Sequence, residues 1–273
     1  MNSPRNCVVA KHIITEKPRE YQQCDYHDPS DQRDFNPRAY LENFYTDVEY
    51  EPAMKIVLLF MPNFVCRLPE CETMLDVGSG PTIHMPMIFR NKVRSIYLSD
   101  FSEDNIRVLE DWRGGVSIFD WSNVIDYLKC LECDYEHPST MENDAKSRVN
   151  GVFRCDIFSS GVIIETKSVT AAEQFDIVTC IYCIEAACTS VQDYHKALDN
   201  VCSKVRPGGY LILGVVLEMP WYQYNYERYN SCYLTEESFF ETLAAVGIDV
   251  TSSSTVYRNH DGIVLLMAQI PEK

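Results

Sequence analysis

The sequence has few basic residues: 24 Lys and Arg stand against 40 Asp and Glu among 273 residues, a formal net charge of −16. Binding to the phosphates of a nucleic acid or to an anionic membrane surface needs clustered Lys and Arg side chains. The charge balance therefore argues against both kinds of partner, whereas it is compatible with a cationic substrate.

Long hydrophobic runs are also missing. Residues 1–18 contain no apolar stretch of signal-peptide length, and no segment reaches the length of a membrane span. We therefore expect a cytoplasmic protein whose twelve cysteines are reduced thiols. Two cysteine pairs, Cys130/Cys133 and Cys180/Cys183, have a spacing that zinc sites use. Because the second pair belongs to an apolar run, buried thiols explain it better, and we predict no metal site.

Two common nucleotide-binding loops are absent around the glycine turn Gly78-x-Gly80, which follows an apolar run. Ile83 replaces the third glycine of a dinucleotide fingerprint, and the Gly-Lys-Ser/Thr of a Walker loop does not occur there. Asp100 stands 20 positions after Gly80, at the end of the next predicted strand, where it can accept hydrogen bonds from two ribose hydroxyls. S-adenosylmethionine, which has an adenosine but no pyrophosphate, fits this pattern. An ordinary strand–turn–helix with an exposed acid is the alternative.

Strand-like and helix-like runs alternate along the chain. This predicts an α/β, Rossmann-like, seven-stranded, mostly parallel sheet with helices on both faces and ligand at the carboxyl ends of the strands. The predicted strands are 73–77, 94–99, 153–157, 175–181, 210–217, 248–255 and 262–268. The predicted helices are 82–90, 104–113, 123–129, 191–205 and 236–246. The segments 130–150 and 219–234 are interpreted as insertions between these elements.

The region before the sheet divides into two parts. Residues 1–33 are polar and charged, a composition typical of disordered segments. Residues 34–70 are expected to form a helical cap, or lid, with one helix over 37–45 and a second over 52–65. Asn36 is the predicted N-cap of the first helix, because Pro37 fits the first helical position.

Seven motifs between residues 35 and 269 are distinctive in combination. They are Phe35-Asn36-Pro37-Arg38-x-Tyr40-Leu41 with Tyr45, Asp76-Val77-Gly78-Ser79-Gly80-Pro81-Thr82-Ile83, Asp100-Phe101-Ser102, Phe119-Asp120-Trp121-Ser122, Cys183-Ile184-Glu185-Ala186, Arg206-Pro207-Gly208-Gly209 and Trp221-Tyr222. Together they resemble the small-molecule methyltransferase family of the nicotinamide, phenylethanolamine and indolethylamine N-methyltransferases and the thioether S-methyltransferase. The resemblance implies a methyltransferase domain over 71–273 that methylates the nitrogen of a small amine or pyridine-type acceptor.

The resemblance also assigns cofactor roles to individual residues. The lid tyrosines would close over the methionine end of S-adenosylmethionine, Asp100 would hold the ribose, and Asp156 with Ile157 would flank the adenine. The residues alone leave other interpretations open: the tyrosines as core aromatics, Asp156 as the cap of a turn, and His84 as a packed imidazole. The cofactor-binding residues predicted from the resemblance are Tyr40, Tyr45, Gly78, Ser79, Gly80, Thr82, His84, Asp100, Asn105, Asp156, Ile157 and Ile181.

Glu185 is the predicted catalytic residue. It follows the fourth predicted strand and matches an acid in the corresponding motif of the phenylethanolamine enzyme. A carboxylate at this place can orient an ammonium group and take a proton from it, whereas a solvated glutamate at the start of a loop is the alternative. Glu218 is a second candidate acid. The predicted substrate-binding residues are Tyr45, Glu185 and Tyr222.

The identity of the acceptor stays open. Val215 and Met219 stand where the nicotinamide and phenylethanolamine enzymes, respectively, carry an acid. The tyrosine-rich segment 222–229 is either an aromatic wall of the acceptor pocket or a surface loop. Three other functions remain as alternatives: a thioether S-methyltransferase, a non-catalytic S-adenosylmethionine-binding protein, and a nicotinamide dehydrogenase, against which Ile83 argues. No heptad run demands an oligomer, so we expect a monomer.

Overall fold

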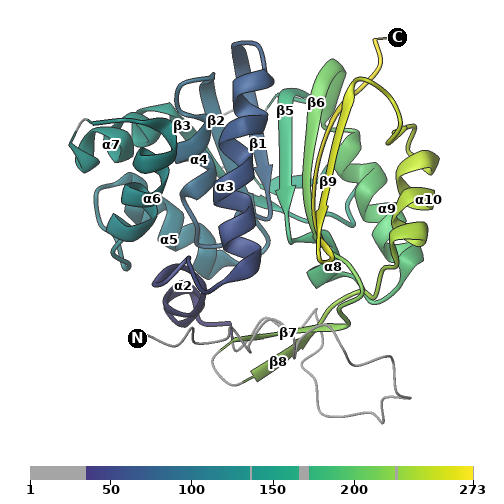
Figure 1. The fold of residues 1–273 in the computed structure, drawn as a ribbon, viewed down its shortest axis with the longest axis horizontal. Helices are drawn as coiled ribbons and strands as arrows, with labels where there is room; N and C mark the ends of the chain where they lie inside the picture. The colour runs from purple at the N-terminus through teal and green to yellow at the C-terminus, as the bar shows by residue number, and fades with distance from the viewer. Residues whose placement is uncertain (1–34, 136, 166–171, 225–226, 273) are drawn as a thin grey trace, which may run out of the picture.

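A large twisted sheet with helices on both faces forms the body of the protein (Figure 1). The computed structural model describes residues 35–135, 137–165, 172–224 and 227–272, so the predicted polar segment 1–33 lies outside the described residues. The sheet has eight strands in the order β4-β3-β2-β1-β5-β6-β10-β9, and β7 and β8 form a separate hairpin. The strands are β1 (Cys71–Val77), β2 (Val93–Asp100), β3 (Val149–Cys155), β4 (Ile163–Glu165), β5 (Phe175–Ile181), β6 (Val205–Val216), β7 (Trp221–Tyr224), β8 (Glu227–Asn230), β9 (Thr255–His260) and β10 (Ile263–Gln269).

The predicted mostly parallel α/β sheet is confirmed, but the predicted number of seven strands is wrong. Strands β3, β2, β1, β5 and β6 run parallel, and the short strand β4 adds an eighth, antiparallel member beside β3. On the other side, β10 and β9 are antiparallel additions. Because the chain continues from β1 to β2 on one side and returns to β5 on the other, the topological switch point lies between β1 and β5, where ligands bind in such sheets.

The strand predicted over 248–255 is wrong, because β9 begins only at Thr255. The Asp249 carboxylate accepts hydrogen bonds from the backbone nitrogen of Thr251 at 2.8 Å and from its hydroxyl at 2.7 Å. The hydroxyls of Ser252 and Ser254 also bond to each other. Such local side-chain bonds offer the backbone a turn in place of a sheet ladder, so the apolar start of this segment does not extend into a strand.

The predicted lid contains two helices, and the first has the expected cap. Asn36 accepts a hydrogen bond from the backbone nitrogen of Ala39 at 3.0 Å. The helices are α2 (Pro37–Tyr45), α3 (Pro52–Arg67), α4 (His84–Phe89), α5 (Glu103–Arg113), α6 (Ser122–Glu132), α7 (Pro138–Arg148), α8 (Ile184–Ala187), α9 (Val191–Cys202) and α10 (Glu236–Ala245). Within the described residues, we find no helix with the length and apolar character needed to cross a membrane.

Two segments interpreted as insertions have regular structure. Helix α7 occupies much of 130–150, and the β7–β8 hairpin lies within 219–234. The α7 helix buries only Met141 and Ala145 among its side chains, so its sequence carries little of the apolar periodicity that predicts a helix.

Successive residues of the central strands enter two different cores, as expected for side chains that alternate across a sheet. Met74 packs in the core with α3, α4, α6 and α7, whereas its neighbour Leu75 packs in the core with α9 and α10. Helix α2 and the β7–β8 hairpin lie beyond the carboxyl ends of the parallel strands (Figure 1). These two elements therefore cover the carboxyl-terminal end of the sheet.

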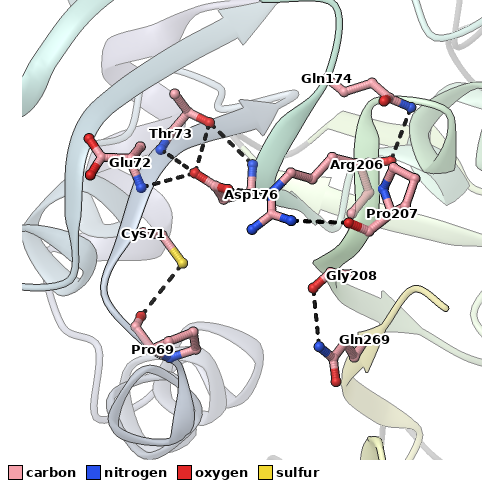
Figure 2. Close-up of polar contacts among 11 residues, drawn as sticks. Pro69, Cys71, Glu72, Thr73, Gln174, Asp176, Arg206, Pro207, Gly208 and Gln269 are labelled. Atoms are coloured by element: carbon pink, nitrogen blue, oxygen red, sulfur yellow. Dashed lines mark hydrogen bonds and ion pairs between the residues drawn. The ribbon is translucent and has the colours of Figure 1, made fainter. Parts of the chain in front are cut away.

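At the opposite, amino-terminal end, Asp176 joins three neighbouring strands (Figure 2). Its carboxylate accepts hydrogen bonds from the backbone nitrogens of Glu72 at 2.9 Å and Thr73 at 2.8 Å. The guanidinium of Arg206 donates to its other oxygen. Although burial opposes the charged form, these hydrogen bonds and the Arg206 charge keep the pKa of Asp176 below its ordinary value. This network stabilises the amino-terminal end of the sheet, opposite the end at which ligands bind in such sheets.

Candidate active site

A cavity of about 440 Å³ opens at the carboxyl ends of the parallel strands, and α2, α3 and the β7–β8 hairpin contribute to its walls. Every residue predicted from the sequence to bind the cofactor or the substrate lines this cavity. These residues are Tyr40, Tyr45, Gly78, Ser79, Gly80, Thr82, His84, Asp100, Asn105, Asp156, Ile157, Ile181, Glu185 and Tyr222. Their side chains come from elements far apart in the sequence, so the fold alone brings them together.

The glycine turn after β1 depends on both of its glycines, for different reasons. Gly78 has a φ of +70°, and a Cβ atom there would lie 2.1 Å from the Sγ atom of Cys183. Gly80 has a φ of +60°, and a Cβ atom there would make an ordinary contact with the Cγ2 atom of Thr82 at 3.7 Å. A side chain at Gly78 would therefore collide with the protein itself, whereas Gly80 is required mainly by its left-handed backbone.

Asp100 lies at the end of β2 and joins the glycine turn to the next helix. Its Oδ2 atom accepts a hydrogen bond from the backbone nitrogen of Gly80 at 2.8 Å. Its Oδ1 atom accepts from the backbone nitrogen of Ser102 at 2.8 Å and from the side-chain amide of Asn105 at 3.0 Å. Burial raises the pKa of Asp100, and these donors act in the opposite direction. The Oδ1 atom of Asn105 is buried without a protein partner, so a ligand hydroxyl could satisfy it.

Asp156 and Ile157 follow β3 directly. Asp156 caps a turn, because its carboxylate accepts a hydrogen bond from the backbone nitrogen of Phe158 at 2.9 Å. Asp156 therefore does cap a turn, as the alternative interpretation of the sequence held, and it also lines the cavity. Phe101 and Phe158, which we did not predict, line the cavity while remaining 42% and 38% exposed. Aromatic side chains that stay accessible at a cavity wall suit contact with a flat ring.

Tyr45 and His84 meet where α2 approaches the start of α4. The Tyr45 hydroxyl lies 3.4 Å from the Nδ1 atom of His84, and both side chains are buried. Burial lowers the pKa of His84 to about 4, so its imidazole is neutral near pH 7, and burial raises the pKa of Tyr45. The Nε2 atom of His84 has no protein partner. The predicted lid helix is thus in direct contact with the end of the glycine turn.

Glu185 is a buried acid on the cavity wall, in the short helix α8 that follows β5. Its Oε1 atom accepts a hydrogen bond from the backbone nitrogen of Val216 at 3.0 Å, and its Oε2 atom has no protein partner. Burial raises the pKa of Glu185 from its ordinary value of 4.5 to about 7. The other candidate acid, Glu218, is exposed and does not line the cavity. A carboxyl group that titrates near neutrality and keeps one oxygen available can exchange a proton with a bound ligand.

The tyrosine-rich segment supplies part of the aromatic wall. The rings of Tyr222 and Tyr229 stack at 5.3 Å with an interplanar angle of 18°, and both line the cavity. Residues 225 and 226 lie outside the described residues. Of the two positions where related enzymes carry an acid, Met219 lines the cavity, whereas Val215 is buried in the sheet and Val216 takes the lining position.

Asp76 and Tyr182 also line the cavity, and neither was among the predicted site residues. Asp76 is 2% exposed and accepts a hydrogen bond from the hydroxyl of Thr179 at 2.5 Å, while burial raises the pKa of Asp76 to about 6. Tyr182 stands immediately after β5. For Asp76, its place before the glycine turn was the available signal. For Tyr182, only its position between two predicted site residues pointed to the cavity.

The cysteine pairs do not come together as a metal site. Cys130 and Cys133 are exposed near the end of α6, whereas Cys180 is buried in β5. Within the described part of the chain, no group of three or more His, Cys, Asp or Glu side chains has an arrangement that could hold a metal ion.

Comparisons with known proteins extend over nearly the whole chain. Nicotinamide N-methyltransferase from Caenorhabditis elegans is 31% identical over 261 residues, which cover 93% of this chain and 94% of that protein. The human nicotinamide N-methyltransferase is 26% identical, with 86% and 92% covered. Phenylethanolamine N-methyltransferase from Macaca mulatta is 28% identical, with 81% and 80% covered.

Solved structures support the fold. The DhpI–SAH complex superimposes with a TM-score of 0.53 at 13% identity, covering 87% of this chain and 94% of that one. A SAM-dependent methyltransferase from Methanosarcina mazei gives a TM-score of 0.51 at 12% identity, covering 78% and 98%. A sequence profile of the NNMT/PNMT/TEMT family matches residues 23–270. The chain therefore belongs to the NNMT/PNMT/TEMT family and is an S-adenosylmethionine-dependent methyltransferase.

Proposed function

We propose that this enzyme transfers a methyl group to the nitrogen of a small amine or pyridine-type acceptor, and that Glu185 handles the acceptor. The observation that carries the proposal is the buried Glu185 carboxyl, whose Oε2 atom lacks a protein partner on the wall of the same cavity as Asp100 and the glycine turn. The relatives named above are N-methyltransferases. The proposed enzyme works in the cytoplasm as a monomer.

The residues of the cavity fit S-adenosylmethionine. The unpartnered Oδ1 atom of Asn105 and the carboxylate of Asp100 offer acceptors for ribose hydroxyls. Ile157, Phe101 and Phe158 offer an apolar surface for the adenine. Tyr40 and Tyr45 would cover the methionine end, where aromatic faces favour a positively charged sulfur.

Bound S-adenosylmethionine supplies a methyl group on a positively charged sulfur, and transfer requires an acceptor lone pair aligned with that group. Tyr40, Tyr45, Tyr222 and Tyr229 line the cavity and would help to exclude water once cofactor and acceptor are bound. For an alkylamine, which enters as an ammonium ion, Glu185 orients the nitrogen and accepts its proton at Oε2. For a pyridine, which is neutral at pH 7, Glu185 only orients.

The test compares wild type with Glu185→Gln on three acceptor classes: an alkylamine, a pyridine and a thioether. S-adenosylhomocysteine release is measured between pH 6 and pH 9. Glu218→Gln is the matched control, because the same change is made at an exposed glutamate outside the cavity lining.

If an alkylamine is the substrate, Glu185→Gln lowers kcat/KM by about 10²- to 10⁴-fold and removes the rise of the rate through pH 7. Turnover of a pyridine, with a loss of less than about tenfold, assigns Glu185 an orienting role because no proton transfer is lost. Turnover of the thioether alone would contradict N-methylation. Tight cofactor binding without turnover of any acceptor would favour the non-catalytic alternative.

A further inference from the structure

Tyr182 has an unusual backbone for a bulky aromatic residue. Its φ is +54°, in the left-handed region that residues other than glycine, asparagine and aspartate seldom adopt. Its backbone nitrogen donates a hydrogen bond to the carbonyl of Gly214 at 2.8 Å, which fixes this turn to β6. Strained residues of this kind persist where surrounding structure over-determines them, and they cluster at functional sites. Tyr182 stands directly after Ile181 and three residues before Glu185.

The strained turn directs the side chain of Tyr182 from the sheet to the lid. Its ring lines the cavity, and its hydroxyl donates a hydrogen bond to the carbonyl of Ala53 at 3.1 Å. Ala53 lies in the first turn of α3 and lines the same cavity. A single side chain thus connects the end of β5 to a helix 129 residues earlier in the sequence.

The position of α3 matters for the site because α3 follows α2 after a short connection over 46–51. Helix α2 carries Tyr40 and Tyr45, the lid residues that would cover the cofactor. Burial raises the pKa of Tyr182 well above its ordinary value, and the nearby Glu185 and Tyr40 side chains raise it further. The phenol therefore stays protonated. The hydroxyl is therefore a permanent donor to the Ala53 carbonyl at any pH at which the enzyme works.

We propose that Tyr182 is a positioning residue that ties the lid helices to the sheet through its hydrogen bond to Ala53, and that this tie slows the departure of S-adenosylhomocysteine. The part of the proposal that concerns product release rests on the proposed binding of S-adenosylmethionine in this cavity. The tie itself is a property of the protein without ligand, so the two parts can fail separately.

The experiment uses Tyr182→Phe, which removes the hydroxyl and keeps the ring. Tyr257→Phe is the matched control, because the Tyr257 hydroxyl also donates one hydrogen bond, to Glu236 at 2.6 Å, on an exposed surface outside the cavity lining. Hydrogen exchange of the ligand-free proteins over 37–67 tests the tie. Calorimetric titration and stopped-flow displacement with S-adenosylhomocysteine test its role in release, and melting temperatures verify folding.

The expected result is faster exchange over 37–67 in Tyr182→Phe alone. Its affinity for S-adenosylhomocysteine falls by at most roughly tenfold, because losing one neutral hydrogen bond weakens binding only through the fraction of ligand-free protein whose lid has moved away from the sheet. The fall comes from faster dissociation. Exchange and dissociation rates equal to those of wild type would overturn the proposal. Faster exchange with an unchanged dissociation rate would refute the role in release. Failure of wild type to bind S-adenosylhomocysteine would contradict the cofactor assignment instead.

Discussion

Replacing Glu185 by Gln should change the way in which the stability of the protein depends on pH. The carboxyl is 3% exposed, and burial raises its pKa from 4.5 to about 7. The folded protein therefore holds this proton more tightly than the unfolded chain does. Gln has the same shape, can accept the hydrogen bond from Val216, and does not titrate. The difference in stability between variant and wild type thus isolates the titration of one group.

The size of the effect follows from the two pKa values. Glu185 contributes stability that is fully present below pH 4.5 and is lost as the pH rises through about 7, because only the unfolded chain is ionised between these values. A pKa difference of one unit between the folded and unfolded states corresponds to about 1.36 kcal/mol of stability. The total loss of stability is therefore roughly 3 kcal/mol, of which about 2.5 kcal/mol falls between pH 5 and pH 8. Relative to wild type, Glu185→Gln should become more stable by that amount over the same interval.

Urea unfolding of both proteins at pH 5 and pH 8, at constant ionic strength, measures this difference. Glu218→Gln, the same substitution at an exposed glutamate, is measured alongside as the control. A Glu185→Gln difference that stays constant within about 0.5 kcal/mol would refute the reasoning, since it would mean that the carboxyl titrates at its ordinary pKa in the folded protein. The proposed proton transfer near neutral pH would then lose its physical basis.

Substitutions at three further sites, the last with a compensating variant, test other parts of the structure. Asp100→Asn places an amide donor against existing N–H donors and should weaken S-adenosylhomocysteine binding by roughly tenfold to a hundredfold in calorimetric titration; unchanged affinity would contradict the ribose assignment. Asp176→Asn should lower the free energy of unfolding by about 1–3 kcal/mol in urea without altering that affinity, because its network lies at the far end of the sheet. Gly78→Ala should lower stability by at least about 2 kcal/mol, because it strains the backbone and overlaps Cys183. Cys183→Gly should recover part of this loss, and no recovery would argue against the overlap.

Much of the fold could be predicted from the sequence because its signals are local. Apolar runs predicted the five parallel strands, although β3 begins four and β6 five residues before the predicted starts of 153 and 210, and Asn36 with Pro37 marked the start of α2. The sequence did not predict elements that are stabilised mainly by contacts with distant residues. Helix α7 buries two side chains and so shows little periodicity, while β4 is a three-residue strand that exists through its pairing with β3.

The candidate site divides in the same way. The glycine turn and the acid that follows the next strand are sequence patterns, so Gly78, Gly80 and Asp100 could be identified without a structure. The resemblance to known methyltransferases added the lid tyrosines and Glu185. It did not indicate Phe158 or Tyr182, because neither belongs to a spacing pattern and each reaches the cavity only through the arrangement of the strands.

The sequence by itself determined the class of this protein: a parallel α/β sheet whose first turn and second-strand acid suit an adenosine-containing cofactor. Periodicity, glycine positions and charge are local properties, and they need no contact between distant residues. Tertiary structure alone decided how acidic each acid is and which side chains meet. Burial raises the pKa of Glu185 toward neutrality, packing against Cys183 leaves no room for a side chain at Gly78, and Tyr182 reaches α3. Each of these depends on desolvation or contact between residues that only folding brings together.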